Sequence, residues 1–199
     1  KDEKIKKDSE NIIALFTPIL KSFATDVGCE TANLGLQIYG GHGYIKDHGM
    51  EQFVRDSRIA TIYEGTNGIQ ALDLIGRKLN INEGSLINDF FTKIDFFLNN
   101  IKNAEEMENS LKQFKNSYND LLNVTKYIKN IDKKNLNEIN GPAVEYLKMF
   151  SYVSIGFIWL KMMDISLKMK KSKNSFFLET KIATARYYFD KILPITFFL

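Results

Sequence analysis

The stretch Ile62-Tyr63-Glu64-Gly65-Thr66 places one carboxylate between an apolar pair and a glycine, directly before an amphipathic helix that we expect to begin at about Asn67. Apolar flanks destabilise the charged form of a carboxyl group and thereby make it a stronger base. The glycine lets a flat ligand approach the backbone, and the helix start offers unpaired N–H groups to an anionic or carbonyl ligand. The local sequence also allows a second interpretation, a solvated loop that only caps the helix.

The segments on either side of this stretch have the apolar periodicity of helices. Thr17-Pro18 is typical of an N-cap followed by the first helical position, and Gly40-Gly41 is typical of a helix end. We expect helices over 18–39, 51–63 and 67–79, with a glycine-rich loop over 40–49. The positions predicted to face the core are Ile19, Leu20, Phe23, Val27, Leu34 and Ile38 on the first helix, Phe53, Ile59 and Ile62 on the second, and Ile69, Leu72, Ile75, Gly76 and Leu79 on the third.

After a boundary at 80–85, the distal half continues with helical periodicity. The expected helices span 86–102, 110–130, 140–170 and 176–193, and the last one stops at Pro194. Their aromatic-rich stripes are interpreted as core rather than as a ligand site. Because no segment alternates with period two, the predicted fold class is all-α, with one helical region over 1–80 and a second over 81–199.

The composition is that of a globular protein, with 44% apolar and 26% charged residues in a chain of 199. The net charge of +3 is too small to indicate a nucleic-acid partner. Cys29 is the single cysteine, which excludes an intrachain disulfide and favours a reducing compartment such as the bacterial cytoplasm. It lies on an expected helix, so we interpret it as a small core residue rather than a nucleophile.

Membrane and metal functions are not expected from this sequence. The opening KDEKIKKDSE is polar, unlike a signal peptide. The longest uncharged run of the distal half, 149–160, is shorter than the roughly 20 apolar residues of a bilayer span, so we expect no membrane span. His42, Asp47 and His48 are close in sequence, but a metal site needs three or four converging ligands, and we expect none.

Three motifs occur in order within residues 37–79: Q-x-x-G-G at Gln37–Gly41, R-D-x-R at Arg55–Arg58, and I-Y-E-G-T at Ile62–Thr66. Each is weak alone, but in this order and spacing they closely resemble the C-terminal helical domain of the acyl-CoA dehydrogenases. The continuation TNGIQALDLIGRKL resembles the branch that includes the 3-methylmercaptopropionyl-CoA dehydrogenases, which carries an additional C-terminal helical region. The distal half is similar to that region, notably over 150–159 and 181–194.

The resemblance implies oxidation of an acyl-CoA thioester to its trans-2-enoyl form on FAD. It makes Glu64 the base that removes the α-proton while the β-hydride moves to the flavin. The negative charge that builds on the thioester oxygen would be stabilised by the backbone N–H of Glu64 and by a flavin ribityl hydroxyl. Gly65 would let the thioester and the flavin lie close to the chain.

The same resemblance assigns cofactor contacts. The Q-x-x-G-G segment of the family touches the adenine-diphosphate part of FAD, usually on a neighbouring subunit, so a homo-oligomer is implied. Many relatives have T-S-Q after the glycine, whereas this chain has Thr66-Asn67-Gly68, so at Gly68 only the backbone is left for that contact. Arg55, Asp56 and Arg58 are expected to be structural. The FAD contacts implied by resemblance are Gln37, Ile38, Tyr39, Gly40, Gly41, Thr66, Asn67 and Gly68. An electron-transferring flavoprotein is the implied electron acceptor.

A complete enzyme of this family also has an N-terminal helical domain, a middle β-domain and the first helices of the C-terminal bundle, none of which is found in these 199 residues. We therefore expect the isolated chain to be inactive, since catalysis needs accurate positioning. The alternative is a non-catalytic remnant or an interaction and oligomerisation module. In either case the apolar face of the helix over 18–39 is expected to be uncovered, and either a dimer or the distal helices would cover it.

Overall fold

The computed structural model describes residues 2–132, 134–170 and 175–199, and within these ranges the chain is helical with no strand. The predicted all-α fold class is confirmed. The chain divides into two compact units, one of residues Lys1–Leu86 with Asn140–Leu147, the other of Ile87–Ile139 with Lys148–Leu199.

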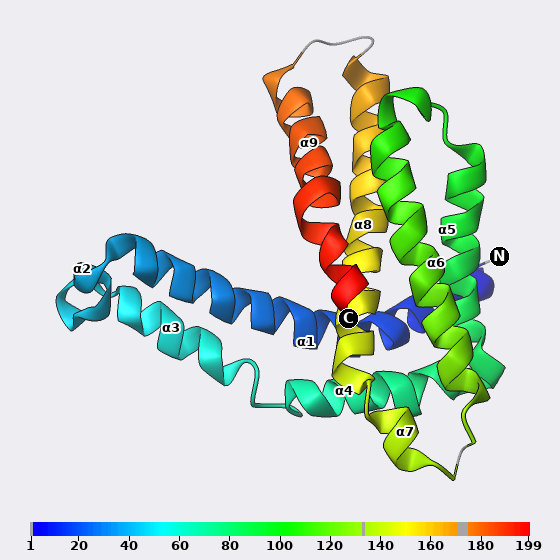
Figure 1. The fold of residues 1–199 in the computed structure, drawn as a ribbon, viewed down its shortest axis with the longest axis horizontal. Helices are drawn as coiled ribbons and strands as arrows, with labels where there is room; N and C mark the ends of the chain where they lie inside the picture. Colours follow the sequence, from blue (N-terminus) through cyan, green and yellow to red (C-terminus); the bar gives the residue numbers. More distant parts are fainter. Residues whose placement is uncertain (1, 133, 171–174) are drawn as a thin grey trace. The chain divides into compact units, whose positions relative to one another are not determined.

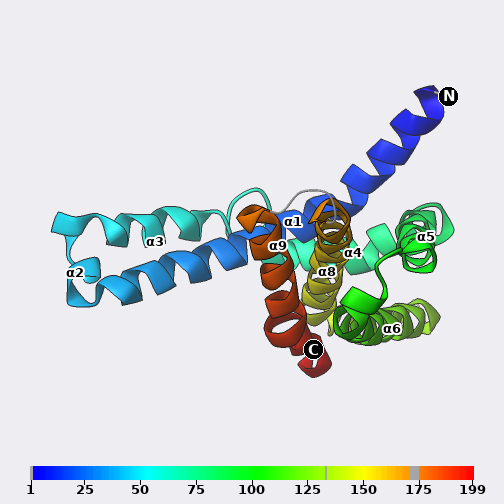
Figure 2. The ribbon, with the colours of Figure 1, turned by 90° about the horizontal axis from the view of Figure 1, so that it is seen from above.

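The first unit is organised around one long helix, α1 (Asp2–Tyr39). At its end the chain turns through α2 (Gly41–Tyr44) and η1 (Lys46–His48) into α3 (Met50–Ile59), which runs back alongside α1 (Figures 1 and 2). A loop then leads to α4 (Asn67–Gly76), which also packs against α1, and to the 3-10 segment η2 (Lys78–Gly84). The α1–α3 pairing includes a hydrogen bond of 3.2 Å from Cys29 Sγ to the Ser57 carbonyl.

The expected helix start at Thr17-Pro18 is wrong, because α1 continues through both residues. Thr17 Oγ1 donates to the Ile13 carbonyl at 2.6 Å, four residues earlier, instead of capping a new helix. Leu15, Pro18 and Ile19 are buried, and this burial offsets the cost of a proline inside a helix, about 3 kcal/mol. The first part of α1, dark blue in Figure 2, runs at an angle to the rest, as expected for a proline kink.

Several positions predicted to face the core of the first unit are exposed instead. Ile38 is 84% exposed and Phe53 63%, whereas Ile19, Ile75 and Leu79 are buried as predicted. The reason is that α3 and α4 are the main partners of α1 and leave part of its apolar surface uncovered. The uncovered face expected for this helix is therefore present. The other exposed positions are Leu20, Val27, Leu34, Ile59, Ile62, Ile69, Leu72 and Gly76.

The second unit is formed mainly by α5 (Ser85–Asn100), α6 (Glu108–Asn130), α8 (Ala143–Lys170) and α9 (Phe176–Tyr187), which run side by side in Figure 1. Aromatic rings fill its core: Phe90 stacks on Phe150 at 5.7 Å between centroids, and Phe91 meets Tyr118 edge to face at 5.7 Å. The interpretation of the aromatic stripes as core is confirmed by this burial. The buried residues of α6 are Ser110, Leu111, Phe114, Ser117, Tyr118, Leu121, Thr125 and Ile128.

The boundaries of the second unit differ from the expectation at two places. A short helix, α7 (Leu136–Asn140), forms before α8, and Asn135 caps it by accepting from Glu138 N at 3.3 Å and donating to Glu138 Oε2 at 2.5 Å. The last helix is not continuous: α9 passes into a π-helical turn, η4 (Tyr188–Ile192), and a 3-10 segment, η5 (Leu193–Phe198). Pro194 lies in the first turn of η5, where its missing N–H is harmless, and does not end the helical chain.

Two helical segments, Ile5–Tyr39 and Leu136–Lys170, are long and apolar enough to cross a membrane by length and composition. This is weak evidence, because a core helix of a soluble protein passes the same test, and half of the second window is buried inside the structure. The expectation that the chain has no membrane span stays a prediction.

Candidate functional site

The candidate site is the loop between α3 and α4. After α3 ends at Ile59, the Ile62 amide donates to the Ile59 carbonyl at 3.0 Å and the Asn67 amide to the Thr61 carbonyl at 3.2 Å, which closes the loop. Two consecutive residues inside it have left-handed backbones, Glu64 with φ 53° and Gly65 with φ 85°. A positive φ is uncommon for a residue other than glycine and often marks a functional constraint.

Two side chains bind the carbonyl groups of these two residues. Lys21 Nζ, on α1, donates to the Gly65 carbonyl at 2.6 Å. Gln70 Nε2, in the first turns of α4, donates to the Glu64 carbonyl at 3.3 Å. The sequence motifs do not indicate either contact, and Lys21 is 44 residues away from Gly65. Tertiary packing of α1 against α4 brings Lys21 there.

Asn67 belongs to the same group of contacts, and its side chain points to α1. Its Oδ1 accepts from Lys21 Nζ at 2.9 Å, and its Nδ2 donates to Asp26 Oδ1 at 2.7 Å and to the Ser22 carbonyl at 3.1 Å. The amide of Asn67 is therefore occupied within the protein. Any cofactor contact at this position falls to the backbone rather than to the side chain.

Thr66 caps α4. Its Oγ1 accepts from the Ile69 amide at 3.4 Å, and its carbonyl accepts from the Gln70 amide at 3.0 Å. In the first turn of α4, the Gly68 amide is the one for which the described residues supply no hydrogen-bond acceptor. The loop is thus a helix cap, as the local sequence allows, and also leaves one N–H group for a ligand.

The apolar enclosure expected around Glu64 is not formed by this chain. Glu64 is exposed, and its neighbours Ile62 and Tyr63 are 48% and 51% exposed. The three side chains therefore form an open surface. The desolvation that would strengthen Glu64 as a base therefore needs a further surface on top of the loop.

The second predicted contact segment, Gln37–Gly41, lies at the other end of the α1–α3 pair. Its residues are all exposed. Gly40 has φ 61°, and no atom lies within 4 Å of where a Cβ would stand, so the backbone is open to a ligand. From Lys21, beside the loop, to Gln37 the helix advances by roughly 24 Å at about 1.5 Å per residue. The structure does not bring the two predicted cofactor segments together.

The arginine motif is structural at one of its positions. Arg58 Nη1 donates to Thr61 Oγ1 at 2.6 Å, and Thr61 is buried, so this contact holds the start of the loop. Asp56 accepts from Gln52 Nε2 at 2.6 Å within α3, and Arg55 is exposed. Of these residues only Arg58 fixes the loop itself.

The histidines pair with each other, with the His42 and His48 rings edge to face at 5.2 Å between centroids. Within the described residues no group of three or more His, Cys, Asp or Glu side chains converges in a way that could hold a metal.

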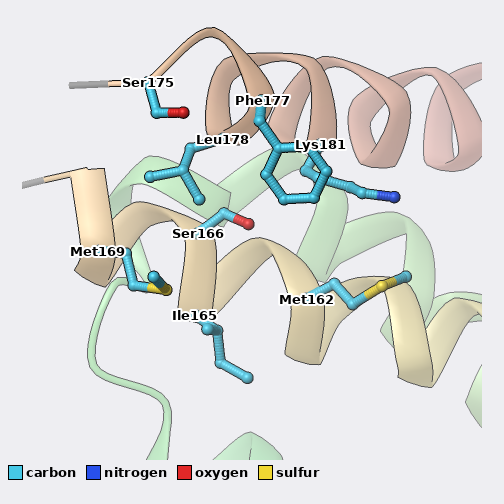
Figure 3. A pocket seen from close by; sticks show the side chains of 8 residues that line it. All are labelled: Met162, Ile165, Ser166, Met169, Ser175, Phe177, Leu178 and Lys181. Atoms are coloured by element: carbon cyan, nitrogen blue, oxygen red, sulfur yellow. The ribbon is translucent and has the colours of Figure 1, made fainter. Parts of the chain in front are cut away.

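An apolar groove also lies between α8 and α9 in the second unit (Figure 3). Lys181 lies at its edge, where its ammonium stands 5.7 Å from the ring centroid of Trp159 and 5.4 Å from that of Phe177. None of the predicted site residues lines this groove. Its lining residues are Met162, Ile165, Ser166, Met169, Ser175, Phe177, Leu178 and Lys181.

Comparison with known proteins identifies the family of the chain. A family model described as "Acyl-CoA dehydrogenase, C-terminal domain" matches residues 4–79, and one described as "Acetyl-CoA dehydrogenase C-terminal like" matches residues 90–199, more than half of the chain. The fold and the motifs therefore define a C-terminal helical region of the acyl-CoA dehydrogenases, and the chain belongs to this family.

Among individual relatives, the chain is similar to 3-methylmercaptopropionyl-CoA dehydrogenase of Ruegeria pomeroyi, with 28% identity over 96% of the chain and 33% of that protein. It is 27% identical to a butyryl-CoA dehydrogenase of Syntrophomonas wolfei over 90% of the chain and 30% of that protein. The chain thus spans about a third of the length of the curated relatives it matches. It also shares its fold with an acyl-CoA dehydrogenase of Bacillus anthracis, crystallised with FAD, at a TM-score of 0.64 and 22% identity, over 90% of the chain and 30% of that protein.

Proposed function

We propose that this chain is the C-terminal portion of an FAD-dependent acyl-CoA dehydrogenase, and that Glu64 is the base that removes the α-proton of the acyl-CoA thioester. The observation that carries the proposal is the loop itself. It presents Glu64 as an exposed carboxylate in a left-handed backbone, beside an α4 amide at Gly68 for which the described residues supply no acceptor. A loop that only capped a helix would not need a strained residue at its tip.

The exposed residues of the first unit fit a bound flavin nucleotide. Gly40 leaves open backbone, and Ile38, Tyr39 and Tyr63 present apolar surface. When bound, FAD would accept the β-hydride together with both electrons of the Cβ–H bond. Glu64 would take the α-proton, and the electrons of the Cα–H bond would form the new C=C bond. The Glu64 amide would donate to the thioester oxygen as negative charge builds there.

The separation of the two contact segments supports a homo-oligomer. Gln37–Gly41 and the Glu64 loop lie at different ends of the α1–α3 pair. The two segments of one chain are therefore far from each other, and we infer that they contact different cofactor molecules. A second subunit that contributes its own Gln37–Gly41 segment resolves this. Acyl-CoA as substrate and an electron-transferring flavoprotein as acceptor belong to the same proposal, and the isolated chain is expected to be inactive.

The test is a comparison of Glu64→Gln with Glu30→Gln in the complete protein that contains this chain. Glu30 is an exposed glutamate on α1, away from the loop, and serves as the matched control. We expect Glu64→Gln to keep its flavin absorbance and to lose acyl-CoA-dependent bleaching by at least about 1,000-fold, while Glu30→Gln keeps both. Undiminished turnover of Glu64→Gln would reject Glu64 as the base.

The second candidate is an interaction or oligomerisation module without catalysis, and the exposed apolar side chains of α1 and α3 favour it. The two candidates differ in flavin content. A complete protein that purifies without flavin, and does not bind added FAD, would favour the module over the enzyme.

A further inference from the structure

The Glu64 loop poses a structural problem that the motif does not solve. Glu64 has φ 53°, a backbone conformation that is strained for a residue with a Cβ, and its side chain is exposed and makes no described hydrogen bond. Such a residue keeps its conformation only where surrounding groups hold it. Since the side chain is not bound, the groups that hold Glu64 must act on the backbone of the loop.

We propose that Lys21 is a positioning residue for Glu64, with Gln70 as its partner, and that together they hold the two consecutive peptide groups that follow the base. The proposal rests on the proposed function of Glu64. Lys21 Nζ binds the Gly65 carbonyl at 2.6 Å, and Gln70 Nε2 binds the Glu64 carbonyl at 3.3 Å. Fixing both carbonyls fixes the rotation of the peptide planes after Glu64 and after Gly65.

The geometry of Gly65 supports the role of Gln70. A Cβ at Gly65 would lie 3.0 Å from Gln70 Nε2, closer than ordinary van der Waals contact. The Gln70 amide can therefore lie across the loop because residue 65 has no side chain. This contact explains the glycine by a neighbour inside the protein, in addition to any ligand.

Lys21 is itself held in place. Its ammonium also donates to Asn67 Oδ1 at 2.9 Å, and the Asn67 side chain is anchored on α1 by Asp26 and the Ser22 carbonyl. Lys21 is partly buried, so its ammonium is partly shielded from water. Its hydrogen bond to the Gly65 carbonyl is charge-assisted and therefore stronger than a hydrogen bond between neutral groups.

It also matters for Glu64 as a base that Lys21 binds a backbone carbonyl and not the Glu64 carboxylate. In the described structure the hydrogen bonds of Lys21 go to Gly65 and Asn67 and not to the Glu64 carboxylate. A lysine paired directly with the carboxylate would stabilise its charged form and weaken it as a base. By binding the Gly65 carbonyl, Lys21 holds the loop without forming an ion pair with the Glu64 carboxylate.

The first test is hydrogen exchange of the loop, which does not depend on catalysis. Lys21→Met removes the ammonium at similar length, and Gln70→Met does the same for the amide; Lys7→Met, an exposed lysine on α1, is the control. In the complete protein we expect peptides covering 62–68 to exchange about tenfold faster in Lys21→Met and in Gln70→Met, with no change in Lys7→Met. Unchanged exchange in both variants would overturn the proposal, whatever their activity.

The second test separates positioning from structural damage. We expect Lys21→Met to lower kcat by roughly 100-fold with flavin content and KM within about twofold of the parent, because the base is misplaced while the binding surfaces remain. Lys21→Arg, which keeps a charged donor, should recover at least about tenfold of this loss. Loss of flavin and activity together in Lys21→Met, or no recovery in Lys21→Arg, would overturn the proposal. Undiminished turnover of Glu64→Gln would reject the base instead, and the exchange result would stand independently of it.

Discussion

At the scale of single residues, the loop depends on two left-handed backbones in succession. Glycine adopts φ 85° without steric cost, so Gly65 is the relaxed member and Glu64 the strained one. The strained member is the residue that carries the proposed chemistry. Lys21 and Gln70 bind the backbone carbonyl groups of these two residues, Gly65 and Glu64 respectively.

Replacement of Gly65 should therefore destabilise the protein. We expect Gly65→Ala to lower the free energy of unfolding by about 1–2 kcal/mol, because alanine is strained at φ 85° and its Cβ would lie 3.0 Å from Gln70 Nε2. Gly28→Ala is the matched control, since Gly28 lies inside α1 with no atom within 4 Å of a new Cβ, and it should gain about 0.5–1 kcal/mol. Urea unfolding of both variants measures the difference, and equal effects would contradict the role of the positive φ.

At the scale of elements, the second unit is held together by close contacts between helices. Tyr188 OH donates to the Tyr152 carbonyl on α8 at 2.6 Å, and Thr196 Oγ1 donates to Ser117 Oγ on α6 at 2.8 Å. These contacts explain why the chain stays helical past Tyr187, in π and 3-10 form, where the sequence predicts one regular helix. The irregular turns bring both hydroxyl groups to their partners.

Gly156 lies at a tightly packed contact between α8 and the Phe114 ring of α6. A Cβ there would lie 3.1 Å from Phe114 Cδ2 and 3.5 Å from Tyr188 Cε1, so the rings fill the space. We expect Gly156→Ala to cost about 1–3 kcal/mol of stability through overpacking, although alanine is the better helix former. Thermal unfolding of Gly156→Ala and of Gly156→Ala with Phe114→Leu tests this, since the smaller side chain should restore part of the loss.

The buried phenol of Tyr188 makes stability depend on alkaline pH. Burial raises the pKa of Tyr188 well above its ordinary value of 10.0, so above that pH the unfolded chain loses this proton while the folded chain keeps it. Stability from this group is complete below pH 10 and falls as pH rises, by up to about 1.4 kcal/mol per pH unit. Urea unfolding between pH 8.5 and 11 should show a shallower decline in Tyr188→Phe than in the parent. Identical slopes would refute the assignment.

At the scale of the whole molecule, α1 and α3 expose apolar side chains that a soluble surface rarely gathers. The relatives that the chain matches are about three times as long as this chain. Exposed apolar side chains also occur next to Glu64, at Ile62 and Tyr63.

The isolated chain should therefore self-associate. We expect sedimentation velocity to show a dimer or larger species that Phe53→Glu, on α3, disrupts. Phe176→Glu, at an apolar position on α9 that is even more exposed than Phe53, is the control and should leave association unchanged. A monodisperse monomer, or association lost only in Phe176→Glu, would contradict this prediction.

Most of the helices and the family were predictable from the sequence because each depends on a local pattern. Apolar residues at helical spacing mark α4, α5, α6 and α8, and Glu64 and Gly65 stand in a motif read along the chain. The sequence-based predictions were wrong where contacts between residues distant in the chain compete with a local sequence pattern. Burial around Pro18 overrides the helix start at Thr17, and the exposure of Ile38 reflects which helices adjoin α1.

By itself the sequence determined the all-α class, the membership of the acyl-CoA dehydrogenases and the residue proposed as base, since periodicity and motif order are properties of neighbours in the chain. Only the tertiary structure decided how that base is held. Lys21 and Gly65 are 44 residues apart, and the distance between Lys21 Nζ and the Gly65 carbonyl is set by the packing of α1 against α4. The positive φ of Glu64 and the hydrogen bonds of the Asn67 side chain to α1 depend on the same packing. Hydrogen bonds depend on distance in space and not on position in the chain.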